Sequence, residues 1–132
     1  MIVVDASVLA VALADDEQDG EAARRRLSED PSLHAPYLID LEVVSVLRRR
    51  AAAGDLADRR VEQALGDLEG LPLTRYPHLP FVRRAWNLRH NVTPYDAAYV
   101  ALAETLECAL VTADRRLAAA SGITCSIEIL TR

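Results

Sequence analysis

Short apolar strands alternate with longer helical segments along almost the whole chain. We expect the strands at residues 2–4, 33–35, 73–76, 109–112 and 127–130, with at least one helix between each strand and the next. Strands joined through helices pair in parallel, because the helix carries the chain back to the end where the previous strand began. The alternation therefore predicts an α/β fold with a mainly parallel central sheet.

Several of the expected helices have recognisable ends. Ser7 is expected to cap the first helix, Thr93 stands before Pro94 at the start of another, and Gly54 stops a third. The expected helices cover residues 7–13, 20–27, 38–53, 58–68, 81–88, 94–106 and 114–120.

The length and composition of the chain fit one domain. Of its 132 residues, 51% are hydrophobic, which is enough to build one core. No repeat, low-complexity tract or interdomain linker divides the sequence. We therefore expect a single domain over residues 1–132.

The chain carries a formal net charge of −5, and all 15 of its basic residues are arginine. The missing lysine excludes a P-loop, a Schiff base and the lysine partner of a phospho-aspartate. A nucleic acid would have to be met by a local patch, because the chain as a whole is acidic. Arginine clusters at 24–26 and 48–50, so either run is a candidate phosphate contact or a solvated helix face.

The sequence favours a cytoplasmic protein that does not bind a membrane. Cys108 and Cys125 lie in apolar stretches without the spacing of a zinc site, so free buried thiols are expected. The apolar run after Asp5 lacks the basic residues that precede the core of a signal peptide. No run approaches the roughly 20 apolar residues of a membrane span.

Four acidic residues stand in apolar surroundings, where a carboxylate loses its hydration unless a cation accompanies it. Asp5 and Asp114 follow predicted strands, Asp96 begins the helix that leads into the strand at 109–112, and Glu42 lies in the helix at 38–53. In a parallel sheet, ligands bind beyond the carboxyl ends of the strands. If the strands at 2–4 and 109–112 are neighbours, Asp5 and Asp114 face one another across a crevice, and Asp96 and Glu42 could lean over the same opening. These four carboxylates are called the acidic quartet.

Two members of the quartet also have a structural interpretation, whereas the apolar neighbours of Glu42 and Asp5 argue against one. Asp96 could complete a capping box with Thr93, and Asp114 could stabilise the start of the helix that follows it. Ser7 and Thr112 fit helix caps or strand-end hydroxyls better than catalytic groups. If the quartet does converge, its oxygen ligands select a hard cation, Mg²⁺ or Mn²⁺. Such a cation suits phosphodiester hydrolysis, because it acidifies a bound water and stabilises charge on the phosphate.

Four segments, in this order, resemble those of a PIN-domain ribonuclease, and specifically the VapC toxins of type II toxin-antitoxin systems. They begin at Val3-Val-Asp, Leu41-Glu-Val, Thr93-Pro-Tyr-Asp and Leu110-Val-Thr-Ala-Asp. The resemblance spans the chain and implies a three-layer α/β/α sandwich with an Mg²⁺- or Mn²⁺-dependent endoribonuclease site. It also implies a homodimer, a small cognate antitoxin that inhibits it in a hetero-oligomer, and structured cellular RNA such as tRNA, rRNA or mRNA as substrate.

Through the resemblance, Asp5, Glu42, Asp96 and Asp114 match the catalytic acidic residues of the family. Asp5, Asp96 and Asp114 would bind the metal, and Glu42 would complete the metal site or orient the attacking water. Ser7 and Thr112 match supporting hydroxyl positions. The chain departs from some relatives in that Arg115 and Arg116 follow Asp114, where those relatives have a further acidic residue. For the RNA backbone we expect contacts from Arg48, Arg49, Arg50 and Arg115.

Three alternatives remain open from the residues alone. A PIN-like module could bind RNA or protein without catalysis, and metal titration would separate this from an enzyme. A phospho-acceptor domain built around Asp5 lacks its lysine. A nuclease of the same fold could cut DNA, which nuclease assays would reveal.

Overall fold

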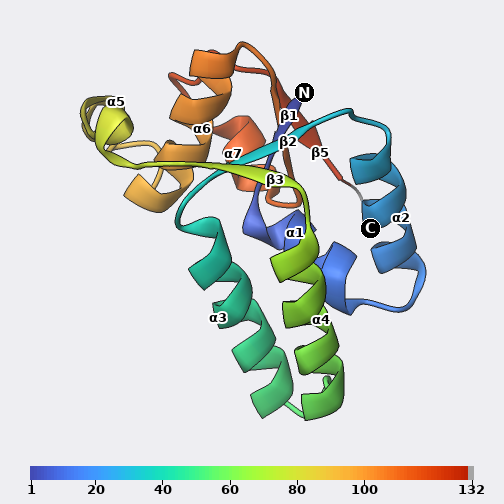
Figure 1. The fold of residues 1–132 in the computed structure, drawn as a ribbon. Helices are drawn as coiled ribbons and strands as arrows, with labels where there is room; N and C mark the ends of the chain where they lie inside the picture. The colour runs from blue at the N-terminus through green and yellow to red at the C-terminus, as the bar shows by residue number, and fades with distance from the viewer. Residues whose placement is uncertain (131–132) are drawn as a thin grey trace.

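The computed structural model describes residues 1–130 and contains a five-stranded sheet, in which every pairing is parallel (Figure 1). The strand order is β3-β2-β1-β4-β5. The strands are β1 (Ile2–Val4), β2 (Leu33–Pro36), β3 (Leu73–Tyr76), β4 (Ala109–Thr112) and β5 (Ile127–Ile129). The prediction of an α/β fold with a mainly parallel sheet is confirmed.

The helices form two groups that follow from the strand order. From β1 to β3 the chain moves one way across the sheet through α1 (Ala6–Ala14), α2 (Gln18–Ser28), α3 (Ile39–Ala52) and α4 (Asp58–Gly70). It then crosses back and continues to β5 through the short helix η1 (Leu79–Phe81), α5 (Val82–Asn87), α6 (Pro94–Leu106) and α7 (Arg115–Ala119). Because parallel crossovers are right-handed, the two directions of travel put these groups on opposite faces of the sheet. The result is the expected three-layer sandwich.

The core lies where the two central strands meet α1 and α6. Val3 and Val4 of β1 are completely buried, and so are Leu110 and Val111 of β4. Nearly the whole middle of α6, from Ala97 to Ala103, is buried as well. A central parallel strand is covered on both faces, which explains its continuous run of apolar residues. The core therefore fixes the positions at which β1 and β4 end.

Helix boundaries agree closely with the sequence predictions, with one informative exception. Thr93 caps α6 by accepting a hydrogen bond from the Asp96 amide, and Gly54 follows α3 with a φ of 83°. The prediction that Ser7 caps α1 is wrong. Asp5 is the cap, because its side chain accepts from the Val8 amide, and Ser7 lies inside the first turn.

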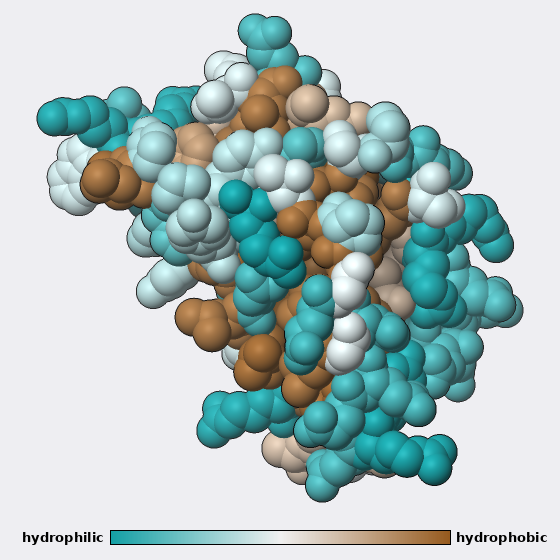
Figure 2. Space-filling view, in the orientation of Figure 1, coloured by the Kyte–Doolittle hydropathy of each residue, from teal (hydrophilic) through white to brown (hydrophobic). Residues whose placement is uncertain are grey.

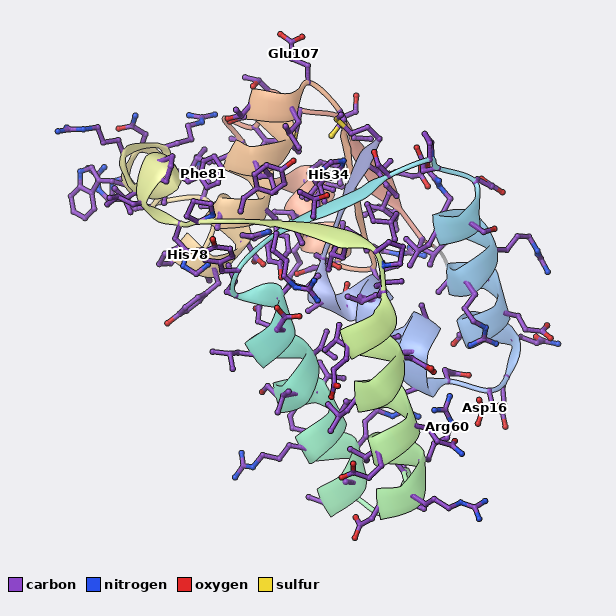
Figure 3. All side chains as sticks on the ribbon, viewed as in Figure 1. Asp16, His34, Arg60, His78, Phe81 and Glu107 are labelled. Carbon is purple, nitrogen blue, oxygen red and sulfur yellow. The ribbon has the colours of Figure 1, made fainter. Side chains whose placement is uncertain are left out.

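Helices α3 and α4 form a hairpin whose tip points away from the sheet (Figure 1). Arg60 of α4 ties this hairpin to the α1–α2 segment, since it donates to Asp16 and to the carbonyl of Leu13 (Figure 3). Where the hairpin begins, Arg75 of β3 donates to both carboxylate oxygens of Asp40 in the first turn of α3. Within residues 1–130, no helix has the length and apolar character needed to cross a membrane.

Candidate active site

The acidic quartet gathers at the point where the chain reverses its direction of travel across the sheet. β1 and β4 are adjacent, with Val4 opposite Val111, so Asp5 and Asp114 leave neighbouring strands at the same edge. The helices that follow these two strands depart to opposite faces, which opens a crevice between them. A pocket of about 390 Å³ lies there, and all four acidic residues line it, together with Ser7, Ser45, Arg49, Tyr99 and Arg116.

Asp5 is the most deeply placed of the four carboxylates, and two hydroxyls hold it. Ser7 Oγ donates to Asp5 Oδ1 at 2.5 Å, and Thr112 Oγ1 donates to Oδ2. Each hydroxyl also accepts one backbone amide of the turn after β4, from Ala113 to Ser7 Oγ at 3.1 Å and from Asp114 to Thr112 Oγ1 at 3.0 Å. Because each hydroxyl has a single proton, accepting from the backbone directs that proton toward Asp5.

Glu42 reaches the pocket from α3 and is oriented by a buried tyrosine. The Tyr99 hydroxyl donates to Glu42 Oε1 at 2.6 Å, and Tyr99 itself is only 2% exposed. This partner could not be found from the sequence, because Tyr99 is one of several positions in the apolar pattern of α6. Its place one turn after Asp96 puts both side chains at the same end of that helix.

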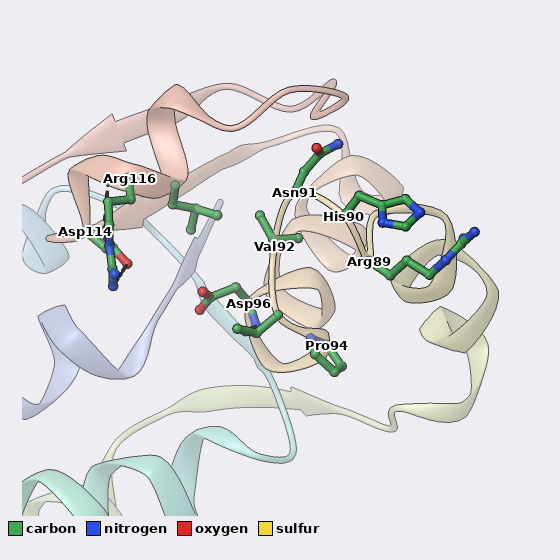
Figure 4. Close-up of a pocket in the computed structure, with 10 residues that line it drawn as sticks. Arg89, His90, Asn91, Val92, Pro94, Asp96, Asp114 and Arg116 are labelled. Carbon is green, nitrogen blue, oxygen red and sulfur yellow. Dashed lines mark hydrogen bonds and ion pairs between the residues drawn. The ribbon is translucent and has the colours of Figure 1, made fainter.

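Asp96 and Asp114 combine a structural role with a position in the pocket. Thr93 Oγ1 accepts from the Asp96 amide at 3.2 Å, which leaves the Asp96 carboxylate available to the pocket. Asp114 caps α7 by accepting from the Arg116 amide, and the Arg116 guanidinium lies against the same carboxylate at 3.3 Å (Figure 4). The capping role of Asp114 is therefore confirmed. The capping box at Thr93 is only half formed among the described residues, because Thr93 accepts from the Asp96 amide but does not donate its own amide to the Asp96 carboxylate.

The electrostatics of the pocket favour a bound cation. Burial raises the pKa of Asp5, and the charge of Asp96 raises it further. Burial also raises the pKa of Glu42 and that of Asp96, and neighbouring carboxylates add to both shifts. Asp114 differs, because its contact with Arg116 lowers its pKa. Three of the four carboxylates are thus destabilised in their charged form, and Arg116 is the only cation that pairs with the quartet among the described residues.

The arrangement is open rather than a closed metal cage. Among residues 1–130, no three His, Cys, Asp or Glu side chains are gathered closely enough to hold an ion by themselves. This fits Mg²⁺, which keeps several waters and takes one or two protein carboxylates together with substrate phosphates. It does not fit a structural zinc site, which encloses the metal with four protein ligands. Asp5, Glu42 and Asp96 are free of Arg116, whereas a cation would meet Asp114 only in competition with that guanidinium.

The arginines predicted to contact RNA are not placed alike. Arg49 lines the quartet pocket, whereas Arg48, Arg50 and Arg115 do not line it. Arg116 does line it, although its neighbour Arg115 is the predicted RNA contact. A helix of five residues gave no periodicity from which to decide which of the two faces the pocket. The RNA contacts of all four chosen arginines stay predictions.

Three comparisons place the chain among known proteins. A family model described as "PIN domain" matches residues 2–123. Ribonuclease VapC9 of Mycobacterium tuberculosis is 44% identical over 132 residues, the full length of both chains. The crystal structure of M. tuberculosis VapC20, described as a sarcin-ricin loop cleaving toxin, has a TM-score of 0.71 at 18% identity and covers 94% of this chain and 97% of its own. A toxin-antitoxin complex from Klebsiella pneumoniae has a TM-score of 0.60 at 16% identity, over 93% and 92% of the two chains.

Proposed function

This chain belongs to the PIN-domain family, and from that membership and its acidic pocket we propose that it is a metal-dependent endoribonuclease, the toxin of a toxin-antitoxin pair. The observation that carries the proposal is the convergence of Asp5, Glu42, Asp96 and Asp114 on one pocket at the switch point of the sheet. The naming of VapC9 as a ribonuclease, at 44% identity over the whole chain, supports the activity.

The proposed cofactor is Mg²⁺ or Mn²⁺, held by Asp5 and Asp96 and, once Arg116 has moved aside, by Asp114. The support is chemical, since all the candidate ligands are oxygens and the charged forms of Asp5 and Asp96 are destabilised by burial. When bound, the cation would lower the pKa of a water and stabilise negative charge on the phosphodiester. The chain's own residues would orient the ligands, accept the proton of the attacking water and contact the RNA.

Those residues have separable tasks. Ser7 and Thr112 hold both oxygens of Asp5, so its remaining lone pairs point in a fixed direction. Glu42, held by Tyr99 through one oxygen, keeps its other oxygen free to accept a proton from the attacking water. Burial raises the pKa of Glu42, which makes it a better base than an exposed carboxylate. Arg49 lines the same pocket and would contact a phosphate of the RNA.

The proposed inhibitor is a cognate antitoxin that covers α3 and the quartet. Leu41 and Val44 of α3 are 76% and 44% exposed, and brown hydrophobic surface is visible along this helix in Figure 2. An apolar pocket of about 230 Å³ lies nearby, lined by residues that include Leu38, Val82 and Tyr95. A hydrophobic antitoxin segment would bury this surface, and an Arg or Lys on it would pair with the quartet. A second copy of the chain would cover other exposed apolar residues, forming the homodimer.

The proposal is tested by RNA cleavage in the presence of Mg²⁺ or Mn²⁺. Asp5→Asn, Asp96→Asn and Asp114→Asn each keep the shape of a ligand and remove its charge, so each should abolish most cleavage while thermal unfolding stays cooperative. The losses should be far from additive, because the residues serve one unit. Arg59→Ala, on the outer side of α4, is the control. If Asp5→Asn/Asp96→Asn cut RNA as fast as the parent, the nuclease assignment would be wrong, and a binding module would replace it.

A further inference from the structure

A second polar pocket adjoins the quartet, and two arginines and a histidine line it together with Asp96 and Asp114. It has a volume of about 420 Å³ and lies between the α5–α6 loop, the start of α6 and α7 (Figure 4). Arg89, His90 and Asn91 come from the loop, and Arg116 comes from α7. In a chain with a net charge of −5, a pocket lined in this way is a local departure from the overall acidity. Such a departure is what a polyanion requires of an acidic protein.

The two pockets are continuous through shared residues. Asp96, Asp114 and Arg116 line both of them. Figure 4 shows Asp96 between the Asp114–Arg116 pair on one side and Arg89 and His90 on the other. A strand with a phosphate at the quartet could therefore continue past Asp96 toward the α5–α6 loop. Along that path the lining changes from four carboxylates beside two arginines to two carboxylates beside two arginines and His90.

The two arginines of this second pocket are available to a ligand. Arg89 makes no ion pair among the described residues; its guanidinium lies 4.2 Å from the centre of the Trp86 ring and donates to the Trp86 carbonyl. This contact restrains the arginine without neutralising it. Arg116 pairs with Asp114 at 3.3 Å, but its side chain is 93% exposed, so solvent weakens the pair. Either guanidinium can turn to a phosphate with little loss of free energy.

We propose that this second pocket binds the RNA strand on one side of the scissile phosphodiester, with Arg89 and Arg116 contacting its phosphates. The proposal rests on the nuclease function proposed above and names the strand path beside the quartet. Single-stranded RNA suits it, because unpaired backbone can bend from one pocket into the next and present its phosphates to a cationic groove. Arg116 then has two positions, one against Asp114 in the free protein and one against the RNA.

The test measures binding without cleavage. A fluorescein-labelled, single-stranded RNA of 12 mixed nucleotides is titrated in EDTA, and fluorescence anisotropy is followed at several salt concentrations. Arg89→Ala/Arg116→Ala should raise the Kd about tenfold and reduce the slope of log K against log salt by roughly 1.4, which is about 0.7 for each lost phosphate contact. Arg89→Lys/Arg116→Lys should recover most of the slope, because a charge is restored at each position.

A matched control removes the same charge elsewhere. Arg59→Ala/Arg83→Ala replaces two exposed arginines that line neither pocket, and it should bind the RNA as the parent does. Parent-like binding by Arg89→Ala/Arg116→Ala, or an equal loss in the control, would overturn the strand path. If the variant lost affinity for the antitoxin but not for RNA, the pocket would belong to the protein partner instead.

Measuring RNA binding and RNA cleavage separately distinguishes a wrong strand path from a wrong nuclease assignment. Asp5→Asn should bind the RNA in EDTA at least as tightly as the parent, because it removes a negative charge near the strand. If Asp5→Asn abolishes cleavage while Arg89→Ala/Arg116→Ala binds normally, the nuclease stands and the path is wrong. A parent protein that neither binds nor cuts RNA would remove both.

Discussion

Asp5 shows how a few hydrogen bonds turn a helix cap into a candidate ligand. A carboxylate at the end of a strand has several rotamers, but Ser7, Val8 and Thr112 all donate to this one. Thr112 also accepts the Asp114 amide, so one hydroxyl connects two members of the quartet. The local pattern around Ser7 and Thr112 favours helix caps or strand-end hydroxyls, whereas the family resemblance matches both to supporting positions of the site. Their role as donors to Asp5 depends on the register of β1 against β4, which no local pattern records.

Thr112→Val tests this connection, because valine keeps the shape and removes the hydroxyl. The Asp114 amide loses its acceptor and Asp5 loses a donor, at a site where Thr112 is completely buried. We expect a loss of about 1–3 kcal/mol in the free energy of unfolding, measured in urea, together with slower RNA cleavage. Thr105→Val is the matched control, since that hydroxyl donates to the Ala101 carbonyl at an exposed position. Equal stability of the two variants would contradict the inferred role.

At the scale of elements, α6 is the helix on which the site depends. It carries Asp96 and Tyr99 at its start, and near its end Glu104 accepts two hydrogen bonds from Arg84 of α5. Glu104 also accepts from the amide and hydroxyl of Thr124, in the segment before β5. The sequence predicted the start of α6 well, because Thr93 and Pro94 form a local signal. It could not predict Arg84 and Thr124 as partners of Glu104, because they are distant along the chain.

The Glu104 cluster predicts a specific acid sensitivity. Arg84 lowers the pKa of Glu104 from 4.5 to about 2, so the carboxylate is more acidic in the folded protein than in the unfolded chain. Its contribution to stability is therefore complete above about pH 4.5 and is lost as the pH falls toward 2, by at most about 3 kcal/mol. Urea unfolding of the parent and Glu104→Gln should differ at pH 7 and converge near pH 2. Glu62→Gln, at an exposed position in α4, should follow the parent throughout.

The α3–α4 hairpin supplies a second prediction at this scale. Gly54 has a φ of 83°, which an L-residue adopts only with strain, so Gly54→Ala should cost about 1 kcal/mol of unfolding free energy. Gly66 lies inside α4 with open space around its Cα, so Gly66→Ala should add roughly 0.5–1 kcal/mol. Chemical unfolding of both variants provides the measurement. The change in unfolding free energy should be negative for Gly54→Ala and positive for Gly66→Ala. Changes of the same sign would contradict the positions assigned to these glycines.

For the whole molecule, the alternation of strands and helices predicted the mainly parallel sheet, and the family resemblance implied the layers. The meeting of Asp5 and Asp114 was predicted on the condition that β1 and β4 are neighbours, and they are. Of the four arginines chosen for RNA contact, Arg49 lines the quartet pocket and the other three do not. The sequence does not indicate that Arg116 and Arg89 line these pockets. The direction of an exposed side chain depends on the tertiary packing of short elements. One cause explains why the strands and helices were predicted more closely than the arginines that line the pockets. Burial leaves a strong periodic pattern in a sequence, and surface charge leaves none.

Metal binding is the prediction that belongs to the whole molecule. A cation that binds only the folded state raises the melting temperature by mass action, so millimolar Mg²⁺ or Mn²⁺ should stabilise the parent but not Asp5→Asn. In Arg116→Ala the competing guanidinium is gone from Asp114, so the stabilisation should begin at a lower metal concentration. Arg115→Ala, one residue away and outside the pocket, should keep the parent's midpoint. An unchanged melting curve for the parent with metal would exclude a shared cation site.

The separation of Asp5 and Asp114 along the chain has a consequence for synthesis. A ribosome makes roughly 5–20 residues each second, and a domain generally folds as a unit. Asp5 leaves the ribosome early, but β4 must emerge and insert beside β1 before the fourth acidic residue can join the others. The growing chain therefore cannot cut RNA for most of its translation, including the message and the ribosome that are producing it. The antitoxin proposed above would have that interval in which to reach the chain before its acidic site is complete.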